Sequence, residues 1–323
     1  MTTLDNAPVT GGAVIGPSME PVGQRTHRIL SRVPTGVLWL IVVLWTVPSF
    51  GLLVTSLRSE ADQISGGWWQ ALTDPSFTLD NYDKALFSPP GGTLPFSDSF
   101  INSFAIAIPG TIIPIAIACA AAYAFAWMDF RGRHWLFIGV LAMMAVPVQM
   151  SLVPLQQLYS GGAHLTLGGS TFILIPDMDL NNKPIAVWLA HTAFGLPLAI
   201  YLLHNYIAGL PRDVFEAARI DGANHFGIFW RIVLPLAKPA IAAFAIFQFL
   251  WVWNDYLISL IFLSQNRDAS PLTIQLVNLV TSRGQGTELL PAAAFISMVV
   301  PLIIFFSLQR YFVRGLLAGS VKG

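Results

Sequence analysis

The feature that most limits the fold of this chain is a series of long apolar runs with almost no charge. Six runs come near the roughly 20 residues that a helix needs to cross a hydrocarbon layer of about 30 Å. We place them at about 35–57, 100–127, 134–158, 184–206, 238–263 and 290–310. Only 11% of the 323 residues are charged, well below the roughly 25% of typical soluble domains. The sequence therefore predicts an all-α membrane protein with six transmembrane helices.

The distribution of positive charge predicts the orientation of these helices. Twelve of the 17 Lys and Arg residues lie in the N-terminal tail, in the loops 128–133 and 207–238, and at the C-terminus. Cytoplasmic segments are enriched in Lys and Arg, so both termini are expected in the cytoplasm. Residues 1–34 are polar and predict a disordered cytoplasmic tail. The membrane domain then covers residues 35–323.

Composition and motifs exclude several classes of function. The net charge is zero, so nothing indicates nucleic-acid binding. Cys119 is the single cysteine, which rules out an intrachain disulfide or a cysteine metal cluster. The sequence lacks a G-x-x-x-x-G-K-[ST] phosphate loop and also the G-x-S-x-G and H-E-x-x-H motifs. We therefore predict no enzyme activity, cofactor or metal in this chain.

The segment 211–239 contains two short helical patterns between the fourth and fifth spans. Asp213 is a good N-cap, and Glu216 three residues later completes a capping box. Gly222 is placed to end this helix in a left-handed turn. A second helix is expected to start near Asn224, with an apolar stripe that continues until Pro235.

The small residues Ala217 and Ala218 allow another protein to approach the first of these helices closely. Its acidic neighbours offer charge contacts to a basic groove, as a docking element requires. The alternative is an amphipathic helix that rests on the membrane surface. Periodicity alone does not separate the two interpretations.

Several spaced motifs in this chain resemble one known family. Glu216-Ala217-Ala218, then Gly222, then Ile232-x-Leu234-Pro235 resemble the EAA loop of ABC-importer permeases. Three further segments are similar to the carbohydrate-uptake permeases of the maltose and α-glucoside type. They are Asn102-Ser103 with Ala122-Tyr123-Ala124-Phe125-Ala126, Trp253-Asn254-Asp255-Tyr256-Leu257, and the ending from Gln309 to Gly315 with Gly319 and Val321-Lys322-Gly323. The resemblance covers residue 35 to the end, and the segment 160–183 is longer than in that pattern.

The resemblance implies a type I importer fold whose cytoplasmic coupling helix docks on an ATPase. The implied contact residues are Glu216, Ala217, Ala218, Asp221 and Gly222. The implied partners are a homologous second permease, a dimer of ATP-binding subunits that holds ATP and Mg, and an extracytoplasmic sugar-binding protein or lipoprotein. The implied activity is import of a di- or oligosaccharide such as an α-glucoside, maltose or trehalose across the bacterial cytoplasmic membrane. A non-sugar solute and an ion-coupled secondary transporter are the alternatives.

Four residues on the fifth span are candidates for the translocation path: Gln248, Trp253, Asn254 and Asp255. Asp255 is the only acid within a span, and ionisable groups at membrane depth usually face the bundle interior, a partner or water. An interhelical hydrogen bond that fixes packing is the alternative. Trp251 and Trp253 could stack on a sugar, although membrane tryptophans more often pack or anchor. His191 and His204 lack a partner with metal-ligand spacing and are expected to pack.

Overall fold

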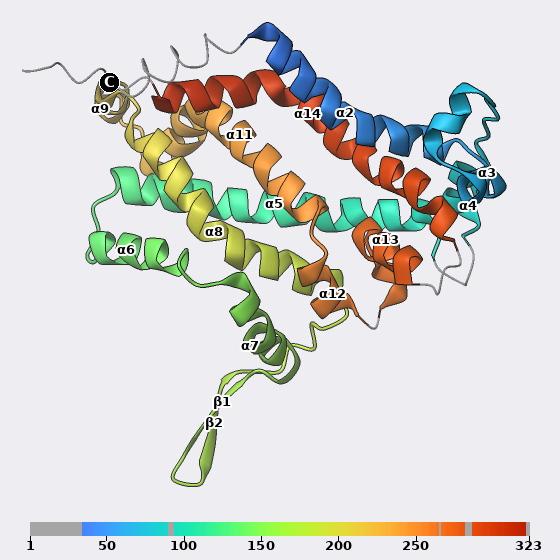
Figure 1. Ribbon diagram of the computed structural model, residues 1–323. Coiled ribbons are helices and arrows are strands. Elements are labelled where there is room, and N and C mark those ends of the chain that lie inside the picture. Colours follow the sequence, from blue (N-terminus) through green and yellow to red (C-terminus); the bar gives the residue numbers. More distant parts are fainter. Residues whose placement is uncertain (1–33, 90–93, 265, 282–285, 321–323) are drawn as a thin grey trace, which may run out of the picture. The chain divides into compact units, whose positions relative to one another are not determined.

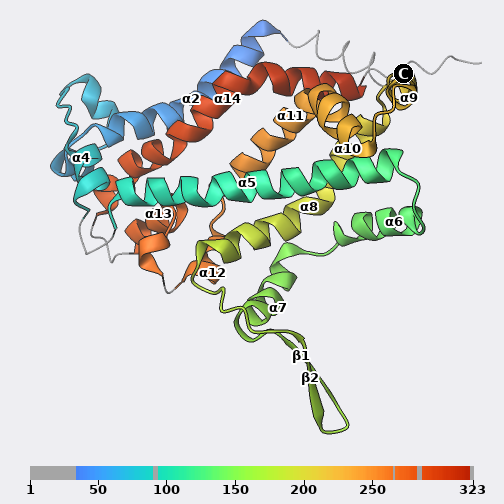
Figure 2. The ribbon, with the colours of Figure 1, turned by 180° about the vertical axis from the view of Figure 1, so that it is seen from behind.

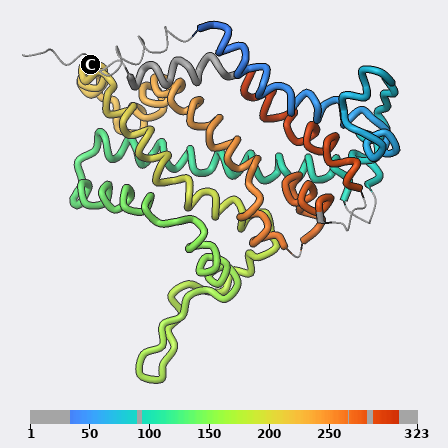
Figure 3. The backbone as a smooth tube through the Cα atoms, in the orientation of Figure 1, coloured from blue at the N-terminus to red at the C-terminus, as the bar shows by residue number. Residues whose placement is uncertain are grey.

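The computed structural model describes residues 34–89, 94–264, 266–281 and 286–320, with side-chain positions up to residue 307 except at residue 281 (Figure 3). The predicted tail therefore lies outside the described residues apart from residue 34, and the side chains of the C-terminal motif lie outside them too. The described residues fall into two compact units, which are divided between Leu52 and Leu53. Helix α2 (Thr35–Ser56) lies mostly in the first unit, and every other described element belongs to the second.

Within the described part of the chain, five helical segments are long and apolar enough to cross a membrane. They are α2, α5 (Phe96–Trp127), α8 (Pro184–Ala208), the run His225–Trp253, and Thr287–Ser307. The last of these joins the short turn η5 (Thr287–Leu289) to α14 (Leu290–Ser320). A sixth span forms if α6 (Arg133–Met143) and α7 (Val148–Gly161) are counted together, although their axes differ by 104°.

Two of the predicted spans are interrupted. The span predicted at 134–158 breaks between α6 and α7 because Pro147 is extended, with φ −63° and ψ 127°, and proline also disfavours helix at the residue before it. The span predicted at 238–263 breaks at Asn254–Tyr256, between α11 (Leu234–Trp253) and α12 (Leu257–Leu263).

The fifth span also begins earlier than predicted. Helix α10 (His225–Ile228) continues through a π-turn, η3 (Phe229–Val233), directly into α11. The prediction that the helix ends at Pro235 was wrong, because the wide π-turn carries the chain past this proline, which occupies the first turn of α11.

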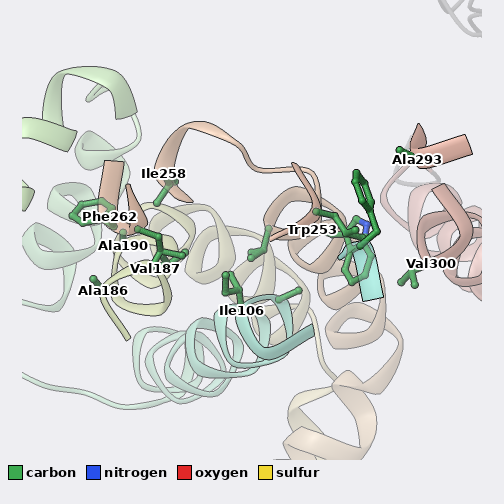
Figure 4. Close-up of a cluster of buried hydrophobic side chains, with 14 of the residues drawn as sticks. Ile106, Ala186, Val187, Ala190, Trp253, Ile258, Phe262, Ala293 and Val300 are labelled. Carbon is green, nitrogen blue, oxygen red and sulfur yellow. The ribbon is translucent and has the colours of Figure 1, made fainter. Parts of the chain in front are cut away.

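The second unit is built around α5. This helix packs against α8 and α11, and α11 packs in turn against α14 (Figures 1 and 2). Figure 4 shows a buried cluster in which the small residues Ala186 and Ala190 of α8 lie near Phe262 of α12, with Ile106 of α5 farther along the same cluster. Small side chains at helix contacts let the backbones approach closely.

Prolines inside the long helices leave carbonyl groups without their usual donor, because proline has no N–H to bond the carbonyl four residues before it. Three of these carbonyls accept a hydrogen bond from a side chain of a neighbouring helix. The donors and carbonyls are Trp188 to Ala105 at 3.0 Å, Gln248 to Gly110 at 3.1 Å, and Trp253 to Ser297 at 3.1 Å, each four residues before Pro109, Pro114 and Pro301. The carbonyls that these prolines leave free therefore link neighbouring helices through side-chain hydrogen bonds.

Short elements occupy the connections at the end of the second unit that lies away from α9 (Arg212–Ile220) (Figure 1). They are α3 (Glu60–Ser65), η1 (Trp68–Leu72), α4 (Asp80–Phe87), η4 (Arg267–Ala269) and α13 (Leu272–Thr281). In the first of these loops the Oδ2 atom of Asp62 accepts hydrogen bonds from the hydroxyls of Ser59 and Ser76, at 2.7 and 2.8 Å.

The lengthened segment 160–183 forms an antiparallel hairpin, which the sequence analysis did not predict. Strands β1 (Ala163–Leu167) and β2 (Ser170–Ile175) are joined by Gly168 and Gly169, which both have positive φ. Two-residue hairpin turns of type I′ require this conformation at both positions. The hairpin extends away from the helices (Figure 1).

Candidate coupling surface and membrane path

Helix α9, in the predicted docking segment, starts differently from the predicted capping box. It runs from Arg212 to Ile220, and its N-cap is Pro211, which makes no side-chain capping bond. Asp213 therefore lies inside the first turn, where a negative charge still interacts favourably with the helix dipole. The capping-box prediction for Asp213 and Glu216 was wrong because the N-cap lies two residues earlier, at Pro211.

A single aromatic side chain attaches α9 to the helix bundle. Phe215 is 1% exposed and stacks on Trp127 at the end of α5, with ring centroids 3.7 Å apart and planes 11° apart. The indole N–H of Trp127 donates to the carbonyl of Ile207 in α8 at 3.0 Å. The sequence analysis did not predict this role for Phe215, although Phe215 is the only aromatic residue in the segment 211–223. The predicted contact residues lie mainly on the other face of the helix.

The opposite face of α9 is open. Asp213, Glu216, Ala217 and Ile220 follow one another at the three- and four-residue spacing of one helix face, and all four are exposed. Ile220 has 86% of its surface exposed. This face presents an apolar side chain, a small residue and two carboxylates together.

The remaining predicted contact residues lie at the end of α9. Asp221 and Gly222 are exposed, whereas Ala218 is half-buried and packs toward the bundle. Gly222 has φ +77°, as predicted. The N–H of Ala223 donates to the carbonyl of Ala218 at 2.9 Å, and that of Gly222 donates to the carbonyl of Arg219 at 3.1 Å. These are the two bonds of a Schellman motif, which satisfies the last carbonyls of a helix.

The next helix is also fixed to α5. A helix starts near Asn224, as predicted, and the side chain of Asn224 caps it by accepting a hydrogen bond from the N–H of Gly227 at 2.8 Å. The hydroxyl of Tyr123 in α5 is 2.9 Å from Nδ1 of His225. Its ring also packs on Phe229 in the π-turn. Both ends of the loop that carries α9 are therefore held by aromatic residues of α5.

The four path candidates on the fifth span lie in different environments. Gln248 is fully buried and borders a pocket of about 230 Å³, whose other lining residues include Phe194, Gly195, Phe247 and Trp251. Trp253 is 3% exposed and packs between α5 and α14, as Figure 4 shows for its place in the buried cluster. The structure brings Gln248 and Trp251 together at the pocket, and it places Trp253 outside the pocket lining.

Asn254 and Asp255 form the break between α11 and α12. Asn254 is exposed, and its amide donates back to the carbonyl of Leu250 at 2.8 Å. The carboxylate of Asp255 accepts from the N–H and the hydroxyl of Ser259, at 2.9 and 3.2 Å, and so caps α12. His191, which is fully buried, has Nε2 at 3.6 Å from Oδ2 of Asp255. The acid therefore joins α8 and α12 at the interruption.

His204, the other histidine expected to pack, is half-buried on α8. Its ring lies against Phe137 of α6, with centroids 4.4 Å apart.

Asn102 and Ser103, which are part of the family resemblance, have a structural role. The amide of Asn102 donates to the carbonyls of Asp268 and Ser270, at 2.6 and 3.2 Å. The hydroxyl of Ser103 accepts from the N–H of Leu272 at 2.9 Å. Both side chains therefore attach the connection between α12 and α13 to the start of α5.

Comparison with known proteins agrees with this architecture. Residues 110–317 match the family described as binding-protein-dependent transport system inner membrane component. The osmoprotective compounds uptake permease protein GgtD of Synechocystis sp. is 54% identical, with 87% of this chain and 89% of that protein covered. The alpha-glucoside transport system permease protein AglG of Rhizobium meliloti is 53% identical, with 84% and 67% covered.

A solved structure has the same fold. One chain of a bacterial ABC transporter involved in the import of the acidic polysaccharide alginate gives a TM-score of 0.68 at 20% identity, with 91% of this chain and 100% of that chain covered. The predicted fold class, a six-helix ABC-importer permease, is thereby confirmed. The chain belongs to the family of binding-protein-dependent transport system inner membrane components.

Proposed function

We propose that this chain is a permease subunit of an ATP-driven importer for an α-glucoside or a similar small oligosaccharide. The observation that carries the proposal is α9, a short helix fixed to the bundle through Phe215 on one face and exposed on the other. Its exposed face has the chemistry of a docking surface, and the family to which the chain belongs works with separate binding proteins. The 53% identity to an alpha-glucoside permease supports the substrate class.

In this proposal α9 lies on the cytoplasmic side and contacts one of two ATP-binding subunits. Glu216, Ala217, Asp221 and Gly222 form the contact, together with Ile220. Ala218 supports it from the bundle side. Both termini are cytoplasmic, in agreement with the distribution of Lys and Arg. ATP and Mg are bound by the partner ATPase, and a second permease and an extracytoplasmic binding protein complete the importer.

The coupling is mechanical. Closure of the ATP-binding pair pushes α9, and the stacked Phe215 and Trp127 pass the displacement to α5. The bundle then moves as a rigid body between inward-facing and outward-facing states. Coupling free energies are reciprocal, so sugar delivery also favours ATPase closure.

A second candidate substrate is an osmoprotective solute. The relative with 54% identity is named for uptake of osmoprotective compounds. Uptake of labelled maltose, compared with labelled glycine betaine, separates the two candidates in vesicles that contain the complete importer.

The docking role is tested by charge reversal in the reconstituted importer. Glu216→Lys places a positive charge on the exposed face of α9 and is expected to reduce both ATPase binding and ATP-driven uptake. Glu60→Lys makes the same change on exposed α3, at the other end of the bundle (Figure 1), and is the control. If both variants bind the ATPase and transport like the wild type, α9 is not the docking element.

A further inference from the structure

The pocket beside Gln248 is lined mainly by apolar side chains. Phe194 and Gly195 come from α8, Phe247, Gln248 and Trp251 from α11, and three aliphatic or methionine side chains complete the wall. None of the lining side chains is charged. A ligand with a net charge would lose its hydration there without gaining a partner, so the pocket suits a neutral molecule.

One polar group of this pocket lacks a partner. The amide nitrogen of Gln248 donates to the carbonyl of Gly110, which fixes the orientation of the amide because only its nitrogen can donate. The Oε1 atom is buried and accepts no hydrogen bond within the described part of the chain. A buried acceptor without a donor costs about 1–3 kcal/mol.

The amide of Gln248 cannot easily rotate to bring Oε1 to another donor. Pro114 leaves the carbonyl of Gly110 without a helix donor, so the Gln248 bond is the one that satisfies it. On the other side Gly195 lies so close that a Cβ atom there would come within 2.9 Å of both amide atoms. The acceptor is therefore held in place beside the pocket by two neighbouring helices. Because Gln248 has no exposed surface in this arrangement, a ligand contacts Oε1 only when the pocket widens.

The aromatic side chains indicate which donor the acceptor receives. The half-buried ring of Trp251 is held edge-on by His191, with centroids 5.2 Å apart, and Phe194 and Phe247 stand beside it. Aromatic faces carry negative partial charge and attract the weakly positive C–H groups of a sugar ring. A hydroxyl of the same ring can donate to Oε1 of Gln248.

The size of the pocket limits the ligand further. Its volume of about 230 Å³ is below the roughly 300–1,000 Å³ of pockets that enclose drug-sized molecules. One sugar ring therefore fits better than a complete oligosaccharide.

We propose that this chain itself holds one neutral sugar ring in transit, stacked on Trp251 with a hydroxyl that donates to Oε1 of Gln248. This rests on the proposed function and adds to it that the subunit contributes a substrate contact of its own. The remaining rings of the substrate extend beyond the pocket.

The experiment uses the complete importer in proteoliposomes with maltose and its 2-, 3-, 4- and 6-deoxy analogues. Gln248→Leu removes the acceptor but also leaves the carbonyl of Gly110 without a donor. The double variant Gln248→Leu/Pro114→Ala restores a backbone N–H for that carbonyl, so only the contact to the ligand is missing. Trp188→Phe is the control, because it removes the equivalent bond to Ala105, which is not among the residues that line the pocket.

We expect the wild type and Trp188→Phe to import one of the analogues about tenfold less well than maltose, as the loss of one neutral hydrogen bond predicts. In the double variant the ratio of maltose uptake to uptake of that analogue should be about tenfold smaller than in the wild type. Discrimination contributed by the binding protein is the same in all of these proteins and cancels.

Equal discrimination by the wild type and the double variant would overturn the sugar contact while leaving the proposed function intact. Absence of ATP-dependent maltose uptake in the wild type would overturn the proposed function instead. If the double variant does not assemble, two variants of Trp251 test the stacking contact instead. Trp251→Phe should keep uptake, and Trp251→Leu should reduce uptake about tenfold. Equal uptake by these two variants would also overturn the proposal.

Discussion

Replacing Phe215 by alanine tests whether one side chain holds α9 on the bundle. The ring is 1% exposed and stacked on Trp127, and truncation of a buried phenylalanine typically costs about 3–5 kcal/mol. The loss should be local, because α9 is a nine-residue helix between two turns. About 3 kcal/mol corresponds to a roughly 100-fold larger population of the detached state.

Hydrogen exchange of the isolated permease in nanodiscs measures this population. The N–H groups of Asp221, Gly222 and Ala223, which are bonded within the end of α9, should exchange roughly 100-fold faster in Phe215→Ala. Ile220→Ala is the matched control on the same helix, since Ile220 is 86% exposed. It should leave exchange unchanged and weaken ATPase binding. Unchanged exchange in Phe215→Ala would refute the idea that this ring anchors α9.

Three further predictions concern other parts of the chain. Gly222→Val should destabilise the end of α9 by about 1–2 kcal/mol because a left-handed conformation is costly for a branched residue, whereas Gly222→Asn should be tolerated; ATPase binding by the two variants compares them. Trp253→Phe should lower the free energy of unfolding by about 1 kcal/mol, and adding Pro301→Ala should recover part of it by restoring a backbone donor, as a double-mutant cycle in detergent would show. The serine hydroxyls around Asp62, that of Ser59 above all, hold the pKa of its carboxyl below the usual 3.8. Protection of this loop from hydrogen exchange should therefore persist at neutral pH and be lost only as the pH falls through the lowered pKa. Loss of protection already near about pH 6 would contradict this prediction.

The sequence predicted two local features of the segment 211–239, the turn at Gly222 and the helix start near Asn224, but not how the segment is attached to the bundle. Gly222 and Asn224 carry local signals, a left-handed turn and an N-cap, which depend on residues next to them in sequence. Phe215 has no such signal, because its partner Trp127 is 88 positions earlier in the chain. The start of α9 was also misplaced, since a proline can stand at an N-cap without any capping side chain.

The spans show the same distinction. Apolar length located the long helices, but it could not show that Pro147 separates two helices while Pro109 and Pro114 leave α5 continuous. The difference depends on partners from other helices. The carbonyls freed by Pro109 and Pro114 accept bonds from Trp188 and Gln248. Long-range donors of this kind have no signature in a single sequence.

These interhelical bonds also determine how a push on α9 can spread. Gln248 joins α11 to α5, and Trp253 joins α11 to α14. Because each bond satisfies a carbonyl that has lost its helix donor, breaking it in an apolar environment leaves that carbonyl unpaired. The three helices are therefore expected to move together rather than slide past one another.

The movement must then be absorbed where a helix is interrupted. In the second unit the described chain offers two such places within the predicted spans, the bend of 104° between α6 and α7 and the interruption at Asn254–Tyr256. The pocket of Gln248 and Trp251 is lined by Met144 and Val148 at the first of these places and by residues of α8 and α11. A displacement that begins at α9 and is carried by α5 and α11 would therefore change the width of this pocket, and ATPase closure would act directly on the proposed sugar contact.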